Sequence, residues 1–240
     1  MKKIGLVLLI GLSIFTAKAQ ERKLHFSSWN TIDIHKKLTQ NWSVNAEFNF
    51  RRTNFLTDWE QFIIRPFVHY TFGNDLDVAI GYSYIKNYSY ADFSAPIDAV
   101  ENNIFQQLTI KHAFSKFSFA HRLRFEERFQ QKIVKTENDS YSIDGIRYRN
   151  RFRYKFQIAI PLYKFNTNRV LSLVAYDEAH LDFGNRLRPE KLDQNWMFLG
   201  VSFRVNNHIK IRTGYHDIYA KRTDFFINNQ IWETTLTYKM

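Results

Sequence analysis

The chain has 240 residues, no cysteine and a formal net charge of +11. The lack of cysteine excludes disulfides, thiolate metal sites and a lipid-modified N-terminal cysteine. Aromatic residues make up 17% of the chain, which holds only 8 glycines and 4 prolines; this composition excludes a disordered or collagen-like protein and favours long β-strands.

The first nineteen residues have the pattern of a secretory signal peptide. Lys2 and Lys3 form a positive start, residues 4–15 form an apolar run, and Ala17-Lys18-Ala19 is a small-x-small cleavage site. Cleavage leaves residues 20–240, which we expect to form one barrel domain with a net charge of +8. The alternative is an uncleaved membrane anchor, but the apolar run is short for a span of about 20 residues and ends in a processing site.

Beyond this segment, apolar and polar residues alternate with the period of two that β-strands show. The clearest case runs from Ile146 to Leu162, where one parity is apolar apart from Asn150 and the other is mostly arginine. No later stretch is long and apolar enough for a transmembrane helix. The expected strands, in chain order, are roughly residues 26–38, 42–55, 59–72, 76–90, 102–114, 117–131, 144–162, 169–183, 193–206, 209–222 and 225–239.

The links between these segments alternate in length. Short turns are expected at 39–41, 73–75, 115–116, 165–168 and 206–207. Longer links are expected near 91–101, 132–143 and 184–192, with modest ones at 55–58 and 222–225. Short turns on one side and longer loops on the other are typical of outer-membrane barrels, in which the turns face the periplasm and the loops face outward.

Alternation alone also permits a soluble periplasmic β protein, because each class has one wet face. Three features favour the membrane barrel. The expected strands span about 12–16 residues, against about 5–6 in soluble proteins and 9–11 for a tilted membrane strand. The last strand carries Trp232, Leu236, Tyr238 and Met240 on one face, which resembles a barrel-assembly signal. Aromatic residues also gather at strand ends like interfacial girdles: Trp42, Phe72, Phe114, Phe117 and Tyr238 near the short turns, and Trp59, Tyr88, Tyr90, Phe129, Trp196 and Tyr219 near the longer links.

We therefore predict an all-β fold, a transmembrane antiparallel up-and-down barrel of ten or twelve strands. Single-chain bacterial barrels have even strand numbers, whereas eleven segments are visible. The ten from 42–55 to 225–239 agree with the loop lengths. Residues 26–38 are then either a non-spanning or inserted piece, or one strand is missing from the count.

Several stretches resemble a known family. They are Trp29-Asn30-Thr31-Ile32-Asp33-Ile34-His35-Lys36-Lys37-Leu38, Trp42-Ser43-Val44-Asn45-Ala46-Glu47-Phe48-Asn49-Phe50-Arg51, Gly81-Tyr82 and Phe125-Glu126-Glu127-Arg128-Phe129. In these the chain resembles an exported family of the Bacteroidota catalogued as domain of unknown function 2490. The resemblance covers nearly all of the mature chain. It implies an outer-membrane barrel and carries over no activity and no functional residues.

Basic residues occupy the polar parity of two expected strands, 117–131 and 144–162. If these strands are neighbours, the basic side chains form one wall of the lumen, and their mutual repulsion requires acidic partners. Glu47, Glu126, Asp177, Glu178 and Glu233 are the candidate partners. The wall is either a structural, salt-bridged filling or an anion-attracting surface, because arginine binds carboxylate and phosphate. Its members are Arg122, Arg124, Arg128, Arg147, Arg149, Arg151, Arg153 and Lys155.

Two histidines, His112 and His121, fall on the apolar parity of adjacent strands. A lipid-facing histidine is what an outer-membrane phospholipase or lipid A deacylase would use, but that chemistry also needs a serine and an orienting polar group. No convincing serine is available, so interfacial histidines are the simpler interpretation. The sequence has no G-x-S-x-G, H-E-x-x-H, P-loop or dinucleotide motif, and we expect no metal site and no cofactor.

The leading hypothesis is a non-enzymatic outer-membrane barrel, either a narrow pore that attracts small anions or a structural barrel. The alternative is a lipid-modifying barrel enzyme. The expected partners are outer-membrane lipids and lipopolysaccharide, the barrel-assembly machinery during biogenesis, and small anionic solutes. Nucleic acid is not expected, because the basic residues alternate with apolar ones instead of clustering. Basic residues at loop bases are candidates for lipopolysaccharide contacts: Lys132, Lys135, Arg186, Arg188, Lys191, Lys221 and Arg222.

Overall fold

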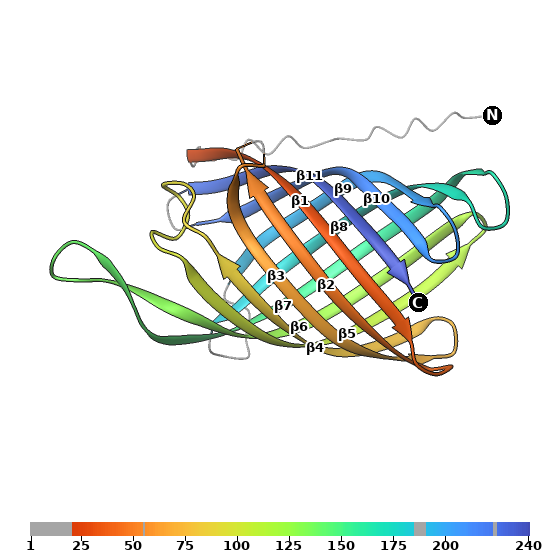
Figure 1. Cartoon of the computed structure of the whole chain (residues 1–240), viewed down its shortest axis with the longest axis horizontal. Coiled ribbons are helices and arrows are strands. Elements are labelled where there is room, and N and C mark those ends of the chain that lie inside the picture. The colour runs from red at the N-terminus through yellow and green to blue at the C-terminus, as the bar shows by residue number, and fades with distance from the viewer. Residues whose placement is uncertain (1–20, 55, 185–190, 223–224) are drawn as a thin grey trace, which may run out of the picture.

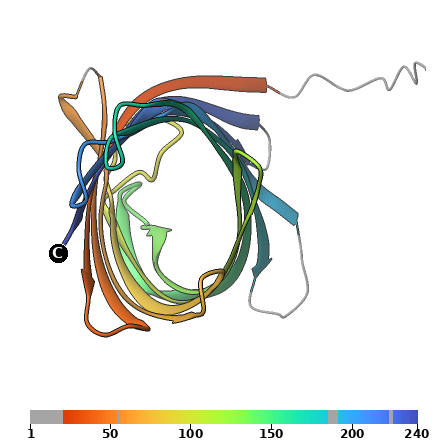
Figure 2. The same cartoon turned by 90° about the vertical axis from the view of Figure 1, so that its right-hand side faces the viewer.

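In the described part of the chain, the alternating sequence forms eleven β-strands that close into a barrel. Figures 1 and 2 show the ring of ribbons. The computed structural model describes residues 21–54, 56–184, 191–222 and 225–240. The predicted signal peptide, residues 1–19, lies outside the described residues. The strands are β1 (Glu21–Lys37), β2 (Trp42–Thr53), β3 (Asp58–Phe72), β4 (Leu76–Asn87), β5 (Ala99–Phe114), β6 (Phe117–Lys135), β7 (Tyr141–Lys164), β8 (Val170–Gly184), β9 (Lys191–Arg204), β10 (Ile209–Lys221) and β11 (Phe225–Lys239).

The predicted all-β barrel is confirmed, and its strand count lies between the predicted ten and twelve. Strands that alternate in direction can be antiparallel at every seam of a closed ring only when their number is even. The eleven-stranded ring therefore has one parallel seam, where β1 pairs with β11 from Glu21↔Phe225 to His35↔Lys239. We expected residues 26–38 either to be a non-spanning or inserted piece or to indicate that one strand was missing from the count. They belong instead to β1, which is a full strand of the wall and also pairs antiparallel with β2.

The links define two rims of the barrel. The turn rim carries the short links 38–41, 73–75, 115–116, 165–169 and 205–208 together with the end of β11, and the loop rim lies at the other end. Gly73 and Ser115 have positive φ values of 60° and 55°, which tight hairpin turns require.

One expected loop is wrong. Residues 132–143 are not a free link, because β6 and β7 continue as paired strands to Lys135 and Tyr141. Only residues 136–140 form the turn. The resulting hairpin projects beyond the loop rim, at the left of Figure 1. Most of the expected link at 184–192 lies outside the described residues.

The two faces of the wall have opposite character. Within β7, Arg153 is buried, whereas its neighbour Tyr154 points outward and is exposed. The buried groups of the barrel are largely charged or polar, including Arg124, Glu126 and Glu178, and the outer wall exposes many large apolar side chains. This is the reverse of the usual arrangement in water-soluble proteins. Within the described residues no helix is long and apolar enough to cross a membrane.

A small apolar cluster lies inside the barrel near the loop rim. Trp29, Ile218, Ala220, Ile227 and Ile231 form it on the adjacent strands β1, β10 and β11. Phe93, from the link between β4 and β5, packs against this cluster. The link at 88–98 therefore reaches across the mouth of the barrel to the opposite wall.

Candidate functional site: the charged lumen

The basic wall is built by two neighbouring strands. β6 and β7 pair antiparallel with Arg124 opposite Arg153 and Arg128 opposite Arg149. Because strand side chains alternate between faces, residues of this parity on both strands point into the barrel. The structure places Arg122, Arg124, Arg128, Arg149, Arg151, Arg153 and Lys155 along the lumen. Arg147, nearest the loop rim, also lines the lumen; it is exposed there and donates to Gln130 Oε1 at 3.1 Å.

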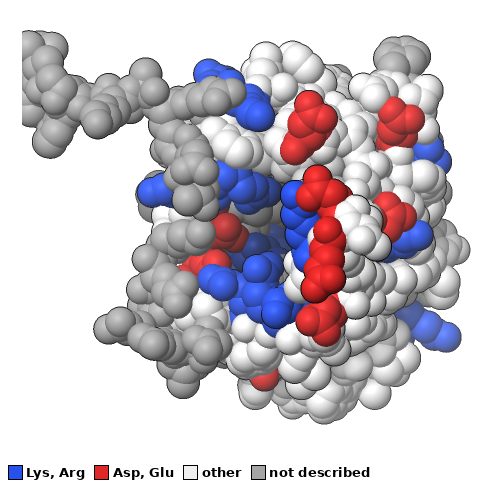
Figure 3. All heavy atoms as spheres, turned by 90° about the vertical axis from the view of Figure 1, so that its left-hand side faces the viewer, with Lys and Arg blue, Asp and Glu red and all other residues white. Residues whose placement is uncertain are grey.

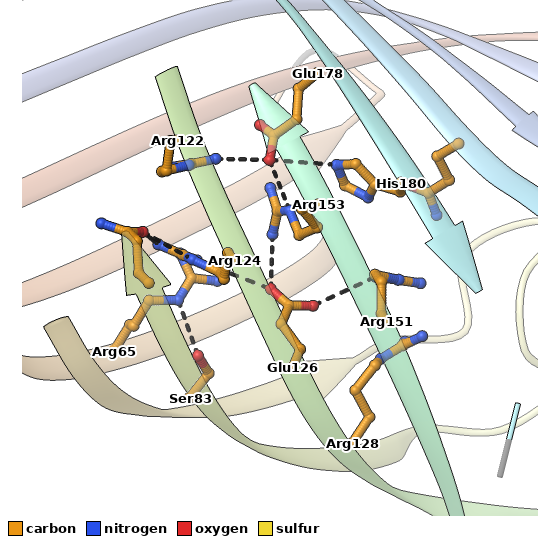
Figure 4. Close-up of polar contacts among 12 residues, drawn as sticks. Arg65, Ser83, Arg122, Arg124, Glu126, Arg128, Arg151, Arg153, Glu178 and His180 are labelled. Carbon is orange, nitrogen blue, oxygen red and sulfur yellow. Dashed lines mark hydrogen bonds and ion pairs between the residues drawn. The ribbon is translucent and has the colours of Figure 1, made fainter. Parts of the chain in front are cut away.

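Glu126 and Glu178 hold the centre of this wall together (Figure 4). Arg153 bridges the two carboxylates, donating from Nη1 to Glu126 at 3.0 Å and from Nε to Glu178 at 2.7 Å. Arg122 donates to the same Glu178 oxygen at 2.6 Å. The two carboxylates thus offset part of the repulsion among the arginines.

Nearer the loop rim, each arginine has its own acid. Arg128 makes a bidentate pair with Glu101, with bonds of 2.7 and 2.8 Å. Arg149 reaches Asp182 at 2.7 Å, and Arg151 reaches Asp193 at 2.6 Å. These three acids were not among the sequence candidates. The parity of their strands is the signal that could have identified them.

A second cluster lies across the lumen around Glu233 of β11. Arg212 donates to Glu233 at 2.5 Å, the His216 ring nitrogen lies 2.7 Å from it, and the Tyr176 hydroxyl donates at 3.2 Å. On β2 and β3, Glu47 pairs with Arg65 at 2.9 Å. Of the five predicted acidic partners, Glu47, Glu126, Glu178 and Glu233 therefore lie inside.

The fifth, Asp177, lies outside. It is adjacent to Glu178 on an extended strand, and neighbouring side chains of a strand point to opposite faces. Asp177 and Glu178 therefore cannot both point into the lumen. The expected place of Trp196 in an outer girdle is also wrong. Its ring lies in the lumen, 5.3 Å from that of Trp29.

Some cations have no acidic partner. Among the described residues, no carboxylate lies within ion-pair distance of Lys155 or Arg51. Lys155 Nζ instead lies 4.6 Å from the centre of the Tyr176 ring, and the Arg51 guanidinium lies 3.5 Å from that of Trp29. Cation–π contacts stabilise these groups without neutralising them, so positive charge remains in excess.

The lumen is a series of three spaces. A cavity of about 630 Å³ opens toward the loop rim and one of about 710 Å³ toward the turn rim, with a chamber of about 230 Å³ between them. Figure 3 shows the hollow at the loop rim with basic side chains in its depth. The middle chamber is lined by four acids, Asp33, Glu47, Glu178 and Glu233, and by eight basic residues, Arg51, Arg65, Arg122, Arg124, Arg153, Lys155, Lys210 and Arg212.

The link at 88–98 narrows the mouth at the loop rim. Tyr90 stacks on His25 of β1 with ring centres 5.1 Å apart, and Phe93 contacts the same ring at 5.3 Å. Burial, with Glu60 nearby, raises the pKa of Tyr90 well above its usual range. Tyr90 therefore belongs to the mouth, and its expected place in an outer girdle is wrong, because the link folds inward onto the apolar cluster.

His112 and His121 lie on the outer face. Their rings stack with centres 5.3 Å apart, and His121 Nδ1 lies 2.8 Å from the Tyr154 hydroxyl. Among the described residues no serine hydroxyl bonds to either ring. The serine nucleophile that a phospholipase or deacylase of the expected kind holds beside its base is therefore not found at these rings in the described part of the chain. Over the same residues, no group of three or more His, Cys, Asp or Glu could hold a metal ion.

Comparison with known proteins agrees with the resemblance found in the sequence. A family model described as "Protein of unknown function (DUF2490)" matches residues 26–229, and the chain belongs to this family. No curated protein and no solved structure matches the chain.

Proposed function

We propose that this DUF2490 protein is an integral outer-membrane barrel without enzymatic activity, and that its narrow lumen attracts and conducts small anions. The observation that carries the proposal is the middle chamber, with its eight basic and four acidic side chains. A surplus of fixed positive charge in a narrow, low-dielectric path concentrates anions and repels cations.

The outer wall supports the membrane location. Phe114, Trp42 and Phe72, near the turn rim, are 74%, 48% and 50% exposed, as expected of an aromatic girdle in the lipid headgroup region. Strands of 12 to 24 residues exceed the 9–11 that a tilted membrane strand needs. In the proposed orientation, which follows the usual outer-membrane pattern, the short turns face the periplasm and the longer loops face outward.

The same location supplies the proposed partners. Outer-membrane lipids would cover the apolar wall, and lipopolysaccharide phosphates would meet basic residues near the loop rim, such as Lys132, Lys135, Lys221 and Arg222. Strand β11, with exposed Trp232, Leu236 and Tyr238, would be read by the barrel-assembly machinery together with the exposed Met240 that follows it. Export would require the predicted signal at residues 1–19.

A structural, closed barrel is the second candidate, because one specific observation favours it. The middle chamber is small, about 230 Å³, and the Glu126–Arg153–Glu178 bridge along β6 to β8 and the contact between Trp29 and Trp196 hold side chains in place beside it. If the side chains around this chamber close it in the membrane, no solute passes. The two candidates share the fold and differ only in conductance.

Two measurements test the proposal. Cell fractionation should recover the protein with outer membranes, and the folded protein should migrate differently on gels before and after boiling. In planar bilayers under a salt gradient, the wild-type reversal potential should show anion preference. Lys155→Glu, which reverses an unpaired cation of the chamber, should shift this preference toward cations. Recovery as a soluble periplasmic protein would contradict the membrane location, and absence of conductance in folded protein would leave the structural barrel.

A further inference from the structure

The outer wall is not uniform around the barrel. Between the aromatic ends of β2, β3 and β4, the outward side chains are apolar or aromatic, such as Phe48, Ile64 and Val68. On β5 to β9, titratable and amide groups interrupt the apolar face. Gln106 and Glu127 bond to each other across β5 and β6. A second group, the polar patch, consists of His121 on β6, Tyr154 on β7, Asp177 on β8 and Asn195 on β9.

Asp177 is the most unfavourable member of this patch. It is the fourth outward residue of β8 from the turn rim, after Leu171, Leu173 and Ala175, and its side chain is exposed. Its carboxylate accepts from Asn195 Nδ2 at 3.1 Å, and no cation pairs with it among the described residues. In the membrane location proposed above, such a carboxylate would face hydrocarbon, which is costly unless a partner covers it.

His121 offers the complementary group. One ring nitrogen, Nδ1, is engaged by the Tyr154 hydroxyl at 2.8 Å. When that hydroxyl donates, Nε2 carries the ring hydrogen and can donate to a carboxylate. The patch therefore holds both an acceptor and a donor that face the same side.

Phe156 lies between them. In the register of the sheet it is opposite His121 on one side and opposite Asp177 on the other, and it is 37% exposed. A two-fold axis along the membrane normal at Phe156 would bring the β6 side of each copy, which carries His121, to the β8 side of the other, which carries Asp177. Such isologous contacts, made twice, are the rule in two-fold dimers.

We infer that the outer face of β6, β7 and β8 is a self-association surface, and that its occupant is a second copy of this chain, joined by two His121–Asp177 hydrogen bonds around a Phe156–Phe156 contact. The inference rests on the proposed membrane location. The complementarity of donor and acceptor on one patch is what selects a second copy over an unrelated partner.

Single-cysteine cross-linking tests the geometry, since the chain has no cysteine of its own. Phe156→Cys, treated in membranes with a bifunctional maleimide whose spacer is about 8 Å, should give a covalent dimer, because packed sheets lie about 10 Å apart. Val68→Cys on β3, which is equally exposed at 37%, should remain monomeric. Equal cross-linking of both variants would indicate random collision and overturn the inference, as would a folded, uncross-linked Phe156→Cys protein.

A charge exchange tests the contact. Asp177→His or His121→Asp alone should raise the dimer dissociation constant in detergent by about 100-fold, because two bonds worth roughly tenfold each are lost. The double variant Asp177→His with His121→Asp should restore association. Failure of the exchange to restore it, in protein that still shows heat-modifiable migration, would overturn the contact. Fractionation keeps the two hypotheses apart, since a dimer recovered in the soluble fraction contradicts the membrane location and not the interface.

Discussion

The inner and outer walls of this barrel are made by the same strands, yet they stabilise the protein in different ways. On β7, Arg153 is 7% exposed and bonds to Glu126 and Glu178, whereas the next residue, Tyr154, is 39% exposed on the outer face. Arg153 is stable inside the barrel because two carboxylates balance its charge. An outer side chain is stable because of the medium around the barrel.

This difference predicts where a substitution is costly. On the inner wall, removal of one partner leaves a buried opposite charge without compensation, which costs more than the pair itself contributes. On the outer wall, apolar exchanges should be tolerated and a new charge should not. The predictions that follow test the comparison, beginning with the largest expected effect.

Glu126→Gln should have the largest effect on stability. Glu126 is 3% exposed and lies within 4.0 Å of three arginines, Arg124, Arg151 and Arg153. Its neutralisation should lower the unfolding free energy by about 3–5 kcal/mol, as removal of one member of a buried ion pair does. Urea titration in lipid vesicles measures this.

The matched control is the neighbouring residue. Glu127→Gln removes the same charge from the outer face, where the carboxylate accepts from Gln106 and Tyr148 at 3.4 Å. It leaves no cation unpaired and should cost less than about 1 kcal/mol. Similar losses for both variants would refute the division of roles between the two walls.

A charge placed on the outer wall should be the next most harmful change. Ile158→Arg or Phe152→Arg puts a guanidinium on the outward parity of β7 and, in the proposed membrane location, should cost up to about 2–4 kcal/mol. Arg149→Gln, on the opposite parity near the loop rim, should cost less, because its side chain is partly exposed and its partner Asp182 keeps the Gly184 amide as a hydrogen-bond donor. Equal tolerance at the two parities in vesicle refolding would contradict the face assignment.

Lys155→Gln should have the smallest effect on stability. Lys155 has an aromatic partner and no acidic one, so its loss leaves no carboxylate unpaired, and the unfolding free energy should change by less than about 1 kcal/mol. Anion preference should nevertheless decrease, since this cation lines the middle chamber. The decrease should fade near 1 M salt, where the Debye length is about 3 Å. Unchanged reversal potentials at low salt would show that the chamber does not select ions.

Local pattern in the sequence was sufficient for most of the wall. A period of two is enforced by the pleat of a strand, so the alternation from Ile146 to Leu162 determined both the strand and its faces without knowledge of any neighbour. It also placed all eight predicted basic wall residues along the lumen, since Arg122 and Arg153 have the polar parity of their strands. Where two adjacent residues, Asp177 and Glu178, were assigned to one face, the error was a failure to apply this same rule.

The tertiary structure alone decided how the ring closes and which charges meet. No local property of residues 21–37 states that they pair in parallel with residues 225–239, because that seam follows from the parity of the whole strand count. Glu101 meets Arg128, and Asp193 meets Arg151, across 27 and 42 residues of sequence. Each such pair depends on the register between strands, and the inward path of the 88–98 link depends on an apolar cluster built by β1, β10 and β11. These contacts join distant segments, and a period of two carries no information about them.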